Sequence, residues 1–262
     1  MRAVYIGNNR LLVSPSWGGK LIVSSEDRSL MPELAISGTY ELPLTKYIIK
    51  QIKPDNIVVD IGANLGYFTI LLAYMVGTGG KVIAYEADND SIDLIQENVS
   101  INYLSDRVTI INKAVYSENT TINFFVAEKY KGNSSIHKHD DDYFKIYGND
   151  RIVERKIEAI RLDDSIGKFN KIDFVKIDIE GGEYHAFLGM KDLIENGAIK
   201  SIIFELNKKS LGKDFIKLYH LIKNWTDIFD LFFLDNEGNA YTVSIEEVFS
   251  HDFIFSVGMK RR

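Results

Sequence analysis

The sequence predicts an α/β fold in which helices cover both faces of a mostly parallel sheet. Short apolar segments without polar alternation recur along the chain, as expected for strands that are buried on both faces. Segments with apolar residues at helical spacing separate them, and this alternation is typical of βαβ units with right-handed crossovers. The expected strands are residues 56–61, 81–86, 108–113, 172–179 and 199–206, and the expected helices are residues 65–76, 89–103, 183–196 and 213–225.

The two ends of the chain extend this core. Residues 1–31 contain short strand-like runs separated by glycine turns, which predicts an antiparallel element, and residues 43–52 predict a helix. We therefore expect an N-terminal antiparallel β extension over residues 1–37 and a main domain over residues 38–262. The last apolar runs, FDLFFLD and HDFIFSVGMK, predict a closing antiparallel pair of strands.

A long polar segment, residues 129–151, interrupts the main domain. It contains glycine, asparagine and serine, two histidines, and three consecutive aspartates. Loops of this length in compact domains often act as lids over an active site, and otherwise are solvated and mobile. We expect a lid-like insertion that is mobile without ligands. Such a lid could bring an imidazole to an acceptor, which makes His139 an alternative candidate for the catalytic base.

The composition limits the classes of function. The 262 residues carry a net charge of −6 and their Lys and Arg residues form no stripe, so we expect no nucleic-acid partner. The apolar runs are far shorter than the ~20 residues of a membrane span, so no membrane partner is expected. The chain has no cysteine, which favours a cytoplasmic location and leaves no thiol nucleophile. The sequence gives no indication of the oligomeric state.

The segment NIVVDIGANLGYFTILL, residues 56–72, joins a strand to a helix through a glycine-rich turn. Glycine lets the backbone approach a ligand at the positive end of a helix. A dinucleotide site would have G-x-G-x-x-G, but Asn64 stands where the middle glycine belongs. Asp60 precedes the turn and suits a positively charged ligand better than a pyrophosphate. These two residues favour S-adenosylmethionine, with its sulfonium and amino groups, over NAD.

The other predicted cofactor residues follow from the same strand ends. Glu86 ends KVIAYE, where a carboxylate can accept hydrogen bonds from both ribose hydroxyls. The third strand ends near the adenine, and the segment before the first core helix could reach the methionine end. The alternatives are a structural turn, a plain strand end and an exposed helix entry. The predicted cofactor-binding residues are Glu41, Asp60, Gly62, Ala63, Asn64, Gly66, Glu86, Ala87, Asn112, Lys113, Ala114 and Asp178.

The segment DFVKIDIEG supplies the candidate catalytic acids. Lys176, Asp178 and Glu180 alternate, so they share one face while the strand stays extended. Ligands of such sheets bind outside the carboxyl ends of the strands. We expect Asp178 to orient cofactor and acceptor and Glu180 to accept a proton. The alternative is an internal ion pair with a helix cap. Glu205, on the neighbouring strand, either joins this site or pairs with Lys176.

Oxygen ligands for Mg²⁺ are also present. Asp178, Glu205 and Asn207 could hold such an ion, as in some small-molecule O-methyltransferases. Nothing in the spacing requires this, so no metal site is predicted.

Several motifs together resemble the FkbM-type S-adenosylmethionine-dependent methyltransferases. They occur in order between about Gly38 and Asn207, and they are GTYE, VDIGANLGYFTI, IAYEAD, INKAV, LDD, VKIDIEGGEYHAFLGM and IIFEL. The resemblance implies a class I methyltransferase fold, which is a Rossmann-like, seven-stranded sheet with a reversed last strand. It also implies O-methylation of a hydroxyl group on a sugar, glycan or small natural product.

Two rival functions stay open beside O-methylation of a small-molecule or glycan acceptor. One is a methyltransferase that acts on a protein, an RNA or a nitrogen acceptor. The chain lacks the Asn/Asp-Pro-Pro-Tyr signature of base amino methylation and the cysteine of cytosine-5 chemistry. The other rival is a non-catalytic module that binds S-adenosylmethionine. The intact glycine turn and the acids Asp178 and Glu180 argue against it.

Overall fold

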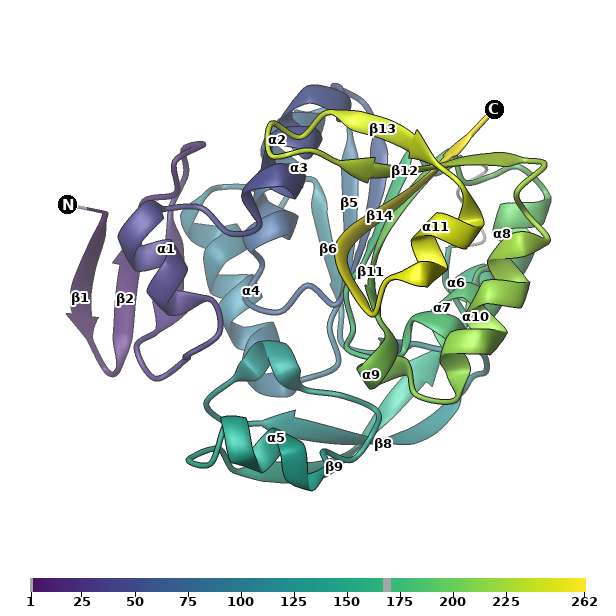
Figure 1. Cartoon of the computed structure of the whole chain (residues 1–262). Helices are drawn as coiled ribbons and strands as arrows, with labels where there is room; N and C mark the ends of the chain where they lie inside the picture. Colours follow the sequence, from purple (N-terminus) through teal and green to yellow (C-terminus); the bar gives the residue numbers. More distant parts are fainter. Residues whose placement is uncertain (1, 167–170) are drawn as a thin grey trace.

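A mixed sheet forms the centre of the molecule (Figure 1). The structure is a computed structural model, and it describes residues 2–166 and 171–262. In this described part, the sheet has eight strands in the order β13-β12-β14-β11-β10-β4-β5-β6. Their bounds are β4 (Ile57–Ile61), β5 (Lys81–Tyr85), β6 (Val108–Ile111), β10 (Phe174–Ile177), β11 (Ser201–Asn207), β12 (Phe229–Leu234), β13 (Ala240–Val243) and β14 (Phe253–Arg261).

The strand directions are those of a class I methyltransferase. Strands β6, β5, β4, β10 and β11 run parallel to one another. Strand β14 runs antiparallel to both β11 and β12, so the predicted reversal of the last strand is confirmed. Strand β13 is one strand more than predicted. It is an edge strand whose first three residues are exposed, so its sequence has no apolar run to reveal it.

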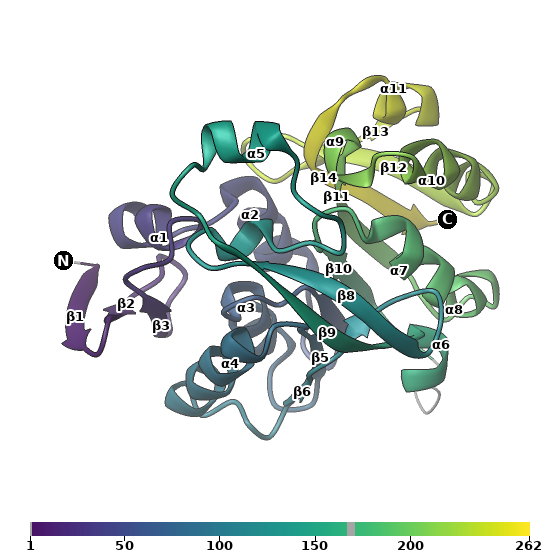
Figure 2. The ribbon, with the colours of Figure 1, turned by 90° about the horizontal axis from the view of Figure 1, so that it is seen from below.

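Helices cover both faces of the sheet (Figure 2). One face carries α2 (Leu42–Gln51), α3 (Tyr67–Val76) and α4 (Asn89–Ile101), and the other carries α6 (Leu162–Ser165), α7 (Glu183–Gly189), α8 (Lys191–Glu195), α10 (Asp214–Lys223) and α11 (Ile245–Ser250). Val58 packs in the first of the two cores and Val59 in the second. Both faces are therefore buried, which explains why the strands lack polar alternation.

The predicted helix over residues 183–196 is two helices in the structure. Helix α7 ends at Gly189, and α8 begins at Lys191. A Cβ at Gly189 would lie 2.0 Å from the carbonyl oxygen of Tyr116, so the chain passes very close to this backbone. Met190, between the two helices, leaves the helical conformation with φ −121°.

The N-terminal extension is tied to the main domain through two asparagines. It contains the antiparallel strands β1 (Ala3–Gly7), β2 (Arg10–Val13) and β3 (Leu21–Ser24), followed by α1 (Met31–Ser37), a helix that was not predicted. Asn98 of α4 bonds to both the N–H and the carbonyl of Ile22, and Asn102 does the same with Lys20. Two amides one helical turn apart thus replace a neighbouring strand along β3.

The 129–151 insertion has secondary structure of its own. It follows β8 (Thr120–Ala127), precedes β9 (Ile152–Ile160), and contains the 3₁₀ turn η1 (Lys131–Asn133) and α5 (Asp141–Ile146). Strands β8 and β9 form a small sheet with β7 (Ala114–Val115), which crosses the front of the molecule in Figure 2.

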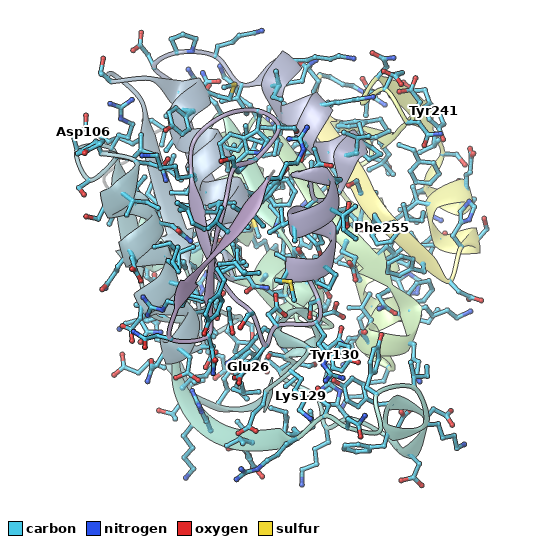
Figure 3. The ribbon with its side chains drawn as sticks, turned by 90° about the vertical axis from the view of Figure 1, so that its left-hand side faces the viewer. Glu26, Asp106, Lys129, Tyr130, Tyr241 and Phe255 are labelled. Atoms are coloured by element: carbon cyan, nitrogen blue, oxygen red, sulfur yellow. The ribbon has the colours of Figure 1, made fainter. Side chains whose placement is uncertain are left out.

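The insertion meets the N-terminal extension at one end of the molecule. Arg28 donates its N–H to the carbonyl of Lys129 at 2.7 Å, and Figure 3 shows Lys129 and Tyr130 at the same end as Glu26. The N-terminal extension and the insertion therefore support each other beside the carboxyl edge of the sheet.

Candidate active site

The carboxyl ends of β4, β5, β10 and β11 meet at one edge of the sheet, where a cavity opens. This first cavity is lined by the glycine turn, by Glu86 and Ala87 after β5, and by Asp178 after β10. Residues 131–134 of the insertion close its outer side. It lies where open α/β sheets bind their ligands.

The glycine turn fits closely against its neighbours. Gly62 has φ 79°, and a Cβ at this position would lie 1.9 Å from the carbonyl oxygen of Asp178. The N–H groups of Gly62 and Ala63 donate to the carbonyl of Tyr85. No larger residue fits at Gly62 without moving the strand that carries Asp178.

Glu86 links this turn to the next strand. Its carboxylate accepts hydrogen bonds from the N–H of Asn64 at 2.7 Å and from that of Asp88 at 2.8 Å. Only 8% of the residue is exposed, and this burial raises the pKa of Glu86 to about 7. Asp88 adds a negative charge nearby, but Lys131 and Arg155 pair with it at 2.9 and 2.7 Å.

Asp60 does not line the cavity, which corrects the expectation that it faces the donor. It is fully buried below the turn, because the alternation of β4 turns it toward α3. Thr69 of α3 donates to it at 2.6 Å, and the Lys176 ammonium lies 3.7 Å away. Asp60 is therefore a buried partner of Lys176 in this structure.

Lys176 lies between two carboxylates. It is the register partner of Asp60 across β4 and β10, and its ammonium donates to Asp178 at 3.1 Å. The ring of Phe68 lies 5.0 Å from the same nitrogen. Burial opposes the charge on Lys176, but the carboxylates of Asp178 and Asp60 outweigh it and raise the pKa of Lys176. The internal ion pair considered for this lysine is present.

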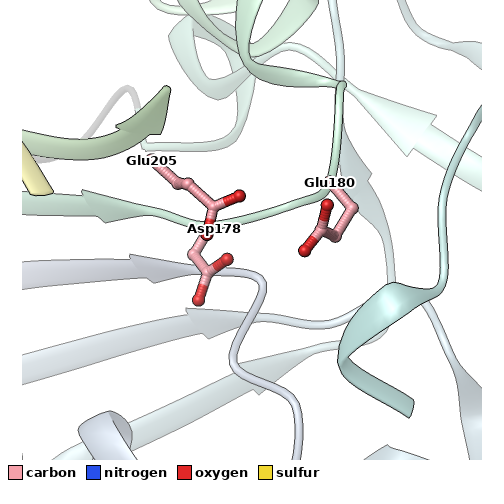
Figure 4. Close-up of side chains that lie close together, drawn as sticks. All are labelled: Asp178, Glu180 and Glu205. Atoms are coloured by element: carbon pink, nitrogen blue, oxygen red, sulfur yellow. The ribbon is translucent and has the colours of Figure 1, made fainter. Parts of the chain in front are cut away.

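Asp178, Glu180 and Glu205 form a cluster that we call the acid trio (Figure 4). Lys176 pairs in register with Ile203, so Asp178 and Glu205, each two residues later, reach the same place on neighbouring strands. One ligand oxygen from each member of the trio lies within 4.8 Å of those from the other two.

Glu180 reaches the trio by a turn. Strand β10 ends at Ile177, before the predicted end at residue 179, so the extended backbone that would have put Glu180 on the face of Lys176 and Asp178 stops short of it. Glu180 has a left-handed backbone with φ 46°, and Gly181 follows with φ 90°. The Ser210 hydroxyl donates to the Glu180 carboxylate at 3.2 Å, and the Ser135 hydroxyl donates to its carbonyl at 2.6 Å.

The acid trio has three acidic side chains and only one lysine in contact with it. Burial and the charge of Asp178 raise the pKa of Glu180 to about 8, and burial and the charge of Glu180 raise that of Glu205 to about 11. Burial and neighbouring acids also raise the pKa of Glu41 to about 8. The Oε1 atom of Glu205 is buried and has no hydrogen-bond partner among the described residues. The arrangement therefore favours binding of protons or of a cation.

A second, larger cavity of about 590 Å³ adjoins the first. The two cavities meet beside two members of the acid trio, because the residues that line both are Ser29, Tyr40, Asn133, Glu180 and Glu205. Aromatic and basic side chains from the extension, the insertion, α9 (Lys208–Leu211) and β14 contribute to its other walls, among them Arg28, Tyr130, Lys138, Tyr143, Tyr147, Lys209, Phe253 and Phe255. Figure 3 labels Tyr130 and Phe255.

Two histidines lie on the wall of the second cavity. His139 stacks on Tyr143 with ring centres 4.0 Å apart, and burial lowers the pKa of His139 against the opposing charges of Asp150 and Asp140. His137 lies beside the turn that follows Glu180, because a Cβ at Gly181 would lie 3.0 Å from the Cδ2 atom of His137.

Most, but not all, predicted cofactor residues line the first cavity. Those that do are Gly62, Ala63, Asn64, Glu86, Ala87, Lys113, Ala114 and Asp178, and those that do not are Glu41, Asp60, Gly66 and Asn112. Gly66 is the N-cap residue before α3, and the Asn112 amide donates to the carbonyls of Glu86 and Ala87. Ser29, Leu30, Phe124 and residues 131–134 also line the cavity, and no motif in the sequence pointed to them.

The strand order and the ligand edge define a class I methyltransferase. The family model of the methyltransferase FkbM domain matches residues 60–229, and the chain belongs to this family. The family and its fold imply S-adenosylmethionine as the methyl donor.

Similar proteins include methyltransferases with different named acceptors. The hexuronic acid methyltransferase AglP of Haloferax volcanii is 24% identical over 193 residues, which is 72% of this chain and 71% of that protein. The ribosomal protein L11 methyltransferase of Carboxydothermus hydrogenoformans is 29% identical over 123 residues, which is 44% of this chain and only 39% of that protein.

Solved structures with a similar arrangement are more distant in sequence. Methyltransferase FkbM from Methylobacillus flagellatus KT has a TM-score of 0.48 at 17% identity, and the match covers 79% of this chain and 44% of that one. The S-adenosylmethionine-dependent O-methyltransferase from Thermotoga maritima has a TM-score of 0.44 at 13% identity, over 95% and 77% of the two chains. None of the described helices is long and apolar enough to cross a membrane.

The ion pair beneath the turn gives a test by double substitution. Lys176→Met leaves Asp60 and Asp178 buried without their cation, so we expect the free energy of unfolding to fall by about 3–5 kcal/mol. Adding Asp60→Asn removes one of the two uncompensated charges and should recover a large part of this loss. Urea unfolding of the parent, the single variants and the double variant measures both effects. A Lys176→Met variant as stable as the parent would contradict the assigned role.

Proposed function

We propose that this protein is an S-adenosylmethionine-dependent O-methyltransferase that methylates a hydroxyl group of a sugar or glycan. The observation that carries the proposal is the junction of the two cavities. Tyr40, Glu180 and Glu205 belong to both walls, so a donor in the first cavity and an acceptor in the second would meet at carboxylates.

The first cavity fits the donor that the family implies. Gly62 lets the turn pack directly against the Asp178 carbonyl, which a Cβ would approach to 1.9 Å, so the turn and Asp178 line the same cavity. Glu86 retains lone pairs for ribose hydroxyls beside its two backbone bonds, and the surplus of acids suits the sulfonium and ammonium charges. Glu86, the turn at residues 62–64 and Asp178 would hold the donor.

The second cavity has the chemistry of a carbohydrate site. Aromatic rings such as Tyr130, Tyr147 and Phe255 offer flat apolar faces, on which the C–H faces of a sugar ring can pack. Arg28 and Lys138 add positive charge to the same walls, where Lys209 pairs with Asp140 at 3.4 Å. Together they support an acceptor sugar that carries a carboxylate, and the Haloferax relative is named a hexuronic acid methyltransferase.

The acids at the junction then have separate tasks. When bound, S-adenosylmethionine supplies an activated methyl group, so the protein has to align the hydroxyl and remove its proton. Asp178, held by Lys176, is proposed to orient donor and acceptor. Glu180, held by Ser210, is proposed to take the hydroxyl proton, with His139 as the alternative base on the lid.

Methyl transfer to a panel of acceptors tests this function. The panel contains neutral sugars, uronic acids, an RNA and a protein, and mass spectrometry detects the added methyl group. We expect transfer to a uronic acid or its glycan, and Glu180→Gln should lower kcat by about 10²–10⁴ while donor affinity stays near that of the parent. Transfer only to RNA or protein would refute the sugar acceptor. Full kcat in Glu180→Gln would refute Glu180 as the base.

Donor binding should depend on pH through Glu86. The ionised carboxylate accepts the ribose hydrogen bonds, and burial raises the pKa of Glu86 to about 7. Affinity for S-adenosylmethionine should therefore fall as the pH decreases below about 7, by at most about tenfold per pH unit. Calorimetry between pH 6 and pH 8 measures this, with NAD as a ligand that should bind poorly.

Glu86→Gln is the control for that titration. It should bind S-adenosylmethionine more weakly at pH 8 and lose most of the pH dependence. A variant with the same pH profile as the parent would show that another group titrates.

The insertion should respond to both ligands. It lines the two cavities, and it touches the trio where Ser135 donates to the carbonyl of Glu180. Amide hydrogen exchange in residues 129–151 should slow when S-adenosylhomocysteine and the acceptor bind, while exchange in β4 should change little. Equally slow exchange with and without ligands would contradict the lid.

A further inference from the structure

The acid trio has the donor set of a divalent-cation site. Asp178, Glu180 and Glu205 each offer one carboxylate oxygen, and the three oxygens all lie within 4.8 Å of one another. Two ligands on opposite sides of one ion are about 4 Å apart for Mg²⁺ and about 5 Å apart for Ca²⁺, which is twice the usual metal–oxygen distance. The side chains are therefore close enough to share an ion with little or no movement (Figure 4).

A second observation points to a ligand at this place. Glu205 is 8% exposed, and its Oε1 atom has no hydrogen-bond partner in the described chain although Glu205 lines both cavities. A buried carboxylate oxygen without a partner is costly. The residues on either side of it in β11, Phe204 and Leu206, are apolar and buried, so Glu205 is an isolated acid in an apolar part of the strand.

The existing cation leaves room for another. Lys176 binds Asp178 through Oδ2 at 3.1 Å, and the nearest acid to it otherwise is Asp60, on the buried side. The other oxygen of Asp178 and the carboxylates of Glu180 and Glu205 remain. When all three carboxyl groups are ionised, one lysine leaves a net negative charge, which one divalent cation would balance.

We propose that Asp178, Glu180 and Glu205 bind a divalent cation such as Mg²⁺, Mn²⁺ or Ca²⁺ at the junction of the two cavities. Carboxylate oxygens are hard ligands of the kind these ions prefer. The three side chains fill only part of the coordination shell, and the remaining positions face the cavities.

The ion gives the proposed reaction a further means of holding its acceptor, and this part rests on the proposed function. Two oxygens of a sugar, for example a hydroxyl and a carboxylate oxygen, could occupy the free positions. A bound cation stabilises the negative charge that develops on the hydroxyl oxygen as its proton leaves. Glu180 would bind the ion through one oxygen and keep the other, which Ser210 contacts, for the proton.

Direct measurement of metal binding tests the site without donor or acceptor. Mn²⁺ is titrated into the metal-free full chain and followed by electron paramagnetic resonance, with Mg²⁺ and Ca²⁺ as competitors. We expect one bound Mn²⁺ per chain with a Kd below about 1 mM. Glu205→Gln should weaken binding at least tenfold, as should Glu180→Gln. Asp141→Asn, in the exposed aspartate run of the insertion, should leave binding unchanged.

Several outcomes would overturn the proposal. They are no Mn²⁺ binding by the parent, equal binding by Glu205→Gln, or loss of binding in Asp141→Asn. If Glu205→Gln does not fold, as judged by thermal unfolding, Glu180→Gln and its tenfold loss decide alone. Methyl transfer that continues at full rate in excess chelator would reject the role of the ion in the reaction and leave the methyltransferase proposal intact.

Discussion

The buried contact of Lys176 with Asp60 and Asp178 supports the rest of the site. It joins the ends of β4 and β10, the two central parallel strands, on the face covered by α3. One side of the lysine faces the fully buried Asp60 and the other faces the cavity. The glycine turn lies directly against this pair, because Gly62 touches the carbonyl of Asp178. A change in the ion pair would therefore move the turn and the acid trio together.

Strand register carries the geometry from this contact outward. Lys176 pairs with Asp60 on one side and with Ile203 on the other, and two residues later the same alignment places Asp178 beside Glu205. Glu180 completes the trio only because its backbone turns left-handed. The acid trio therefore depends on one residue with a left-handed backbone, just beyond the end of β10. Backbone strain of this kind is often found at functional sites.

The sequence predicted the fold because its strongest signals are local. The apolar strands, the helices between them and the turn at Gly62 each leave a pattern within about fifteen residues. Glu86 was also predicted, since it ends a strand next to that turn. Asp60 was expected to face the donor because it comes just before the turn. Only its contacts with Thr69 and Lys176 show that it is buried below the cavity.

The second cavity could not be predicted from motifs. Its walls include parts of the extension, the insertion, α9 and β14, which meet only in the folded chain, and their aromatic and basic residues have no common spacing. The insertion was expected as a loop, yet it contains η1 and α5 and is held by Asp88, Ser29 and Glu180. These are single contacts between distant segments, and no local pattern encodes them.

A crystal structure with S-adenosylhomocysteine and a uronic acid tests the central claim most directly. The account predicts the ribose at Glu86, the thioether sulfur beside the acid trio, and an acceptor hydroxyl facing it from the second cavity. A product molecule bound elsewhere, or an acceptor whose hydroxyl groups lie away from Glu180 and Glu205, would contradict the account.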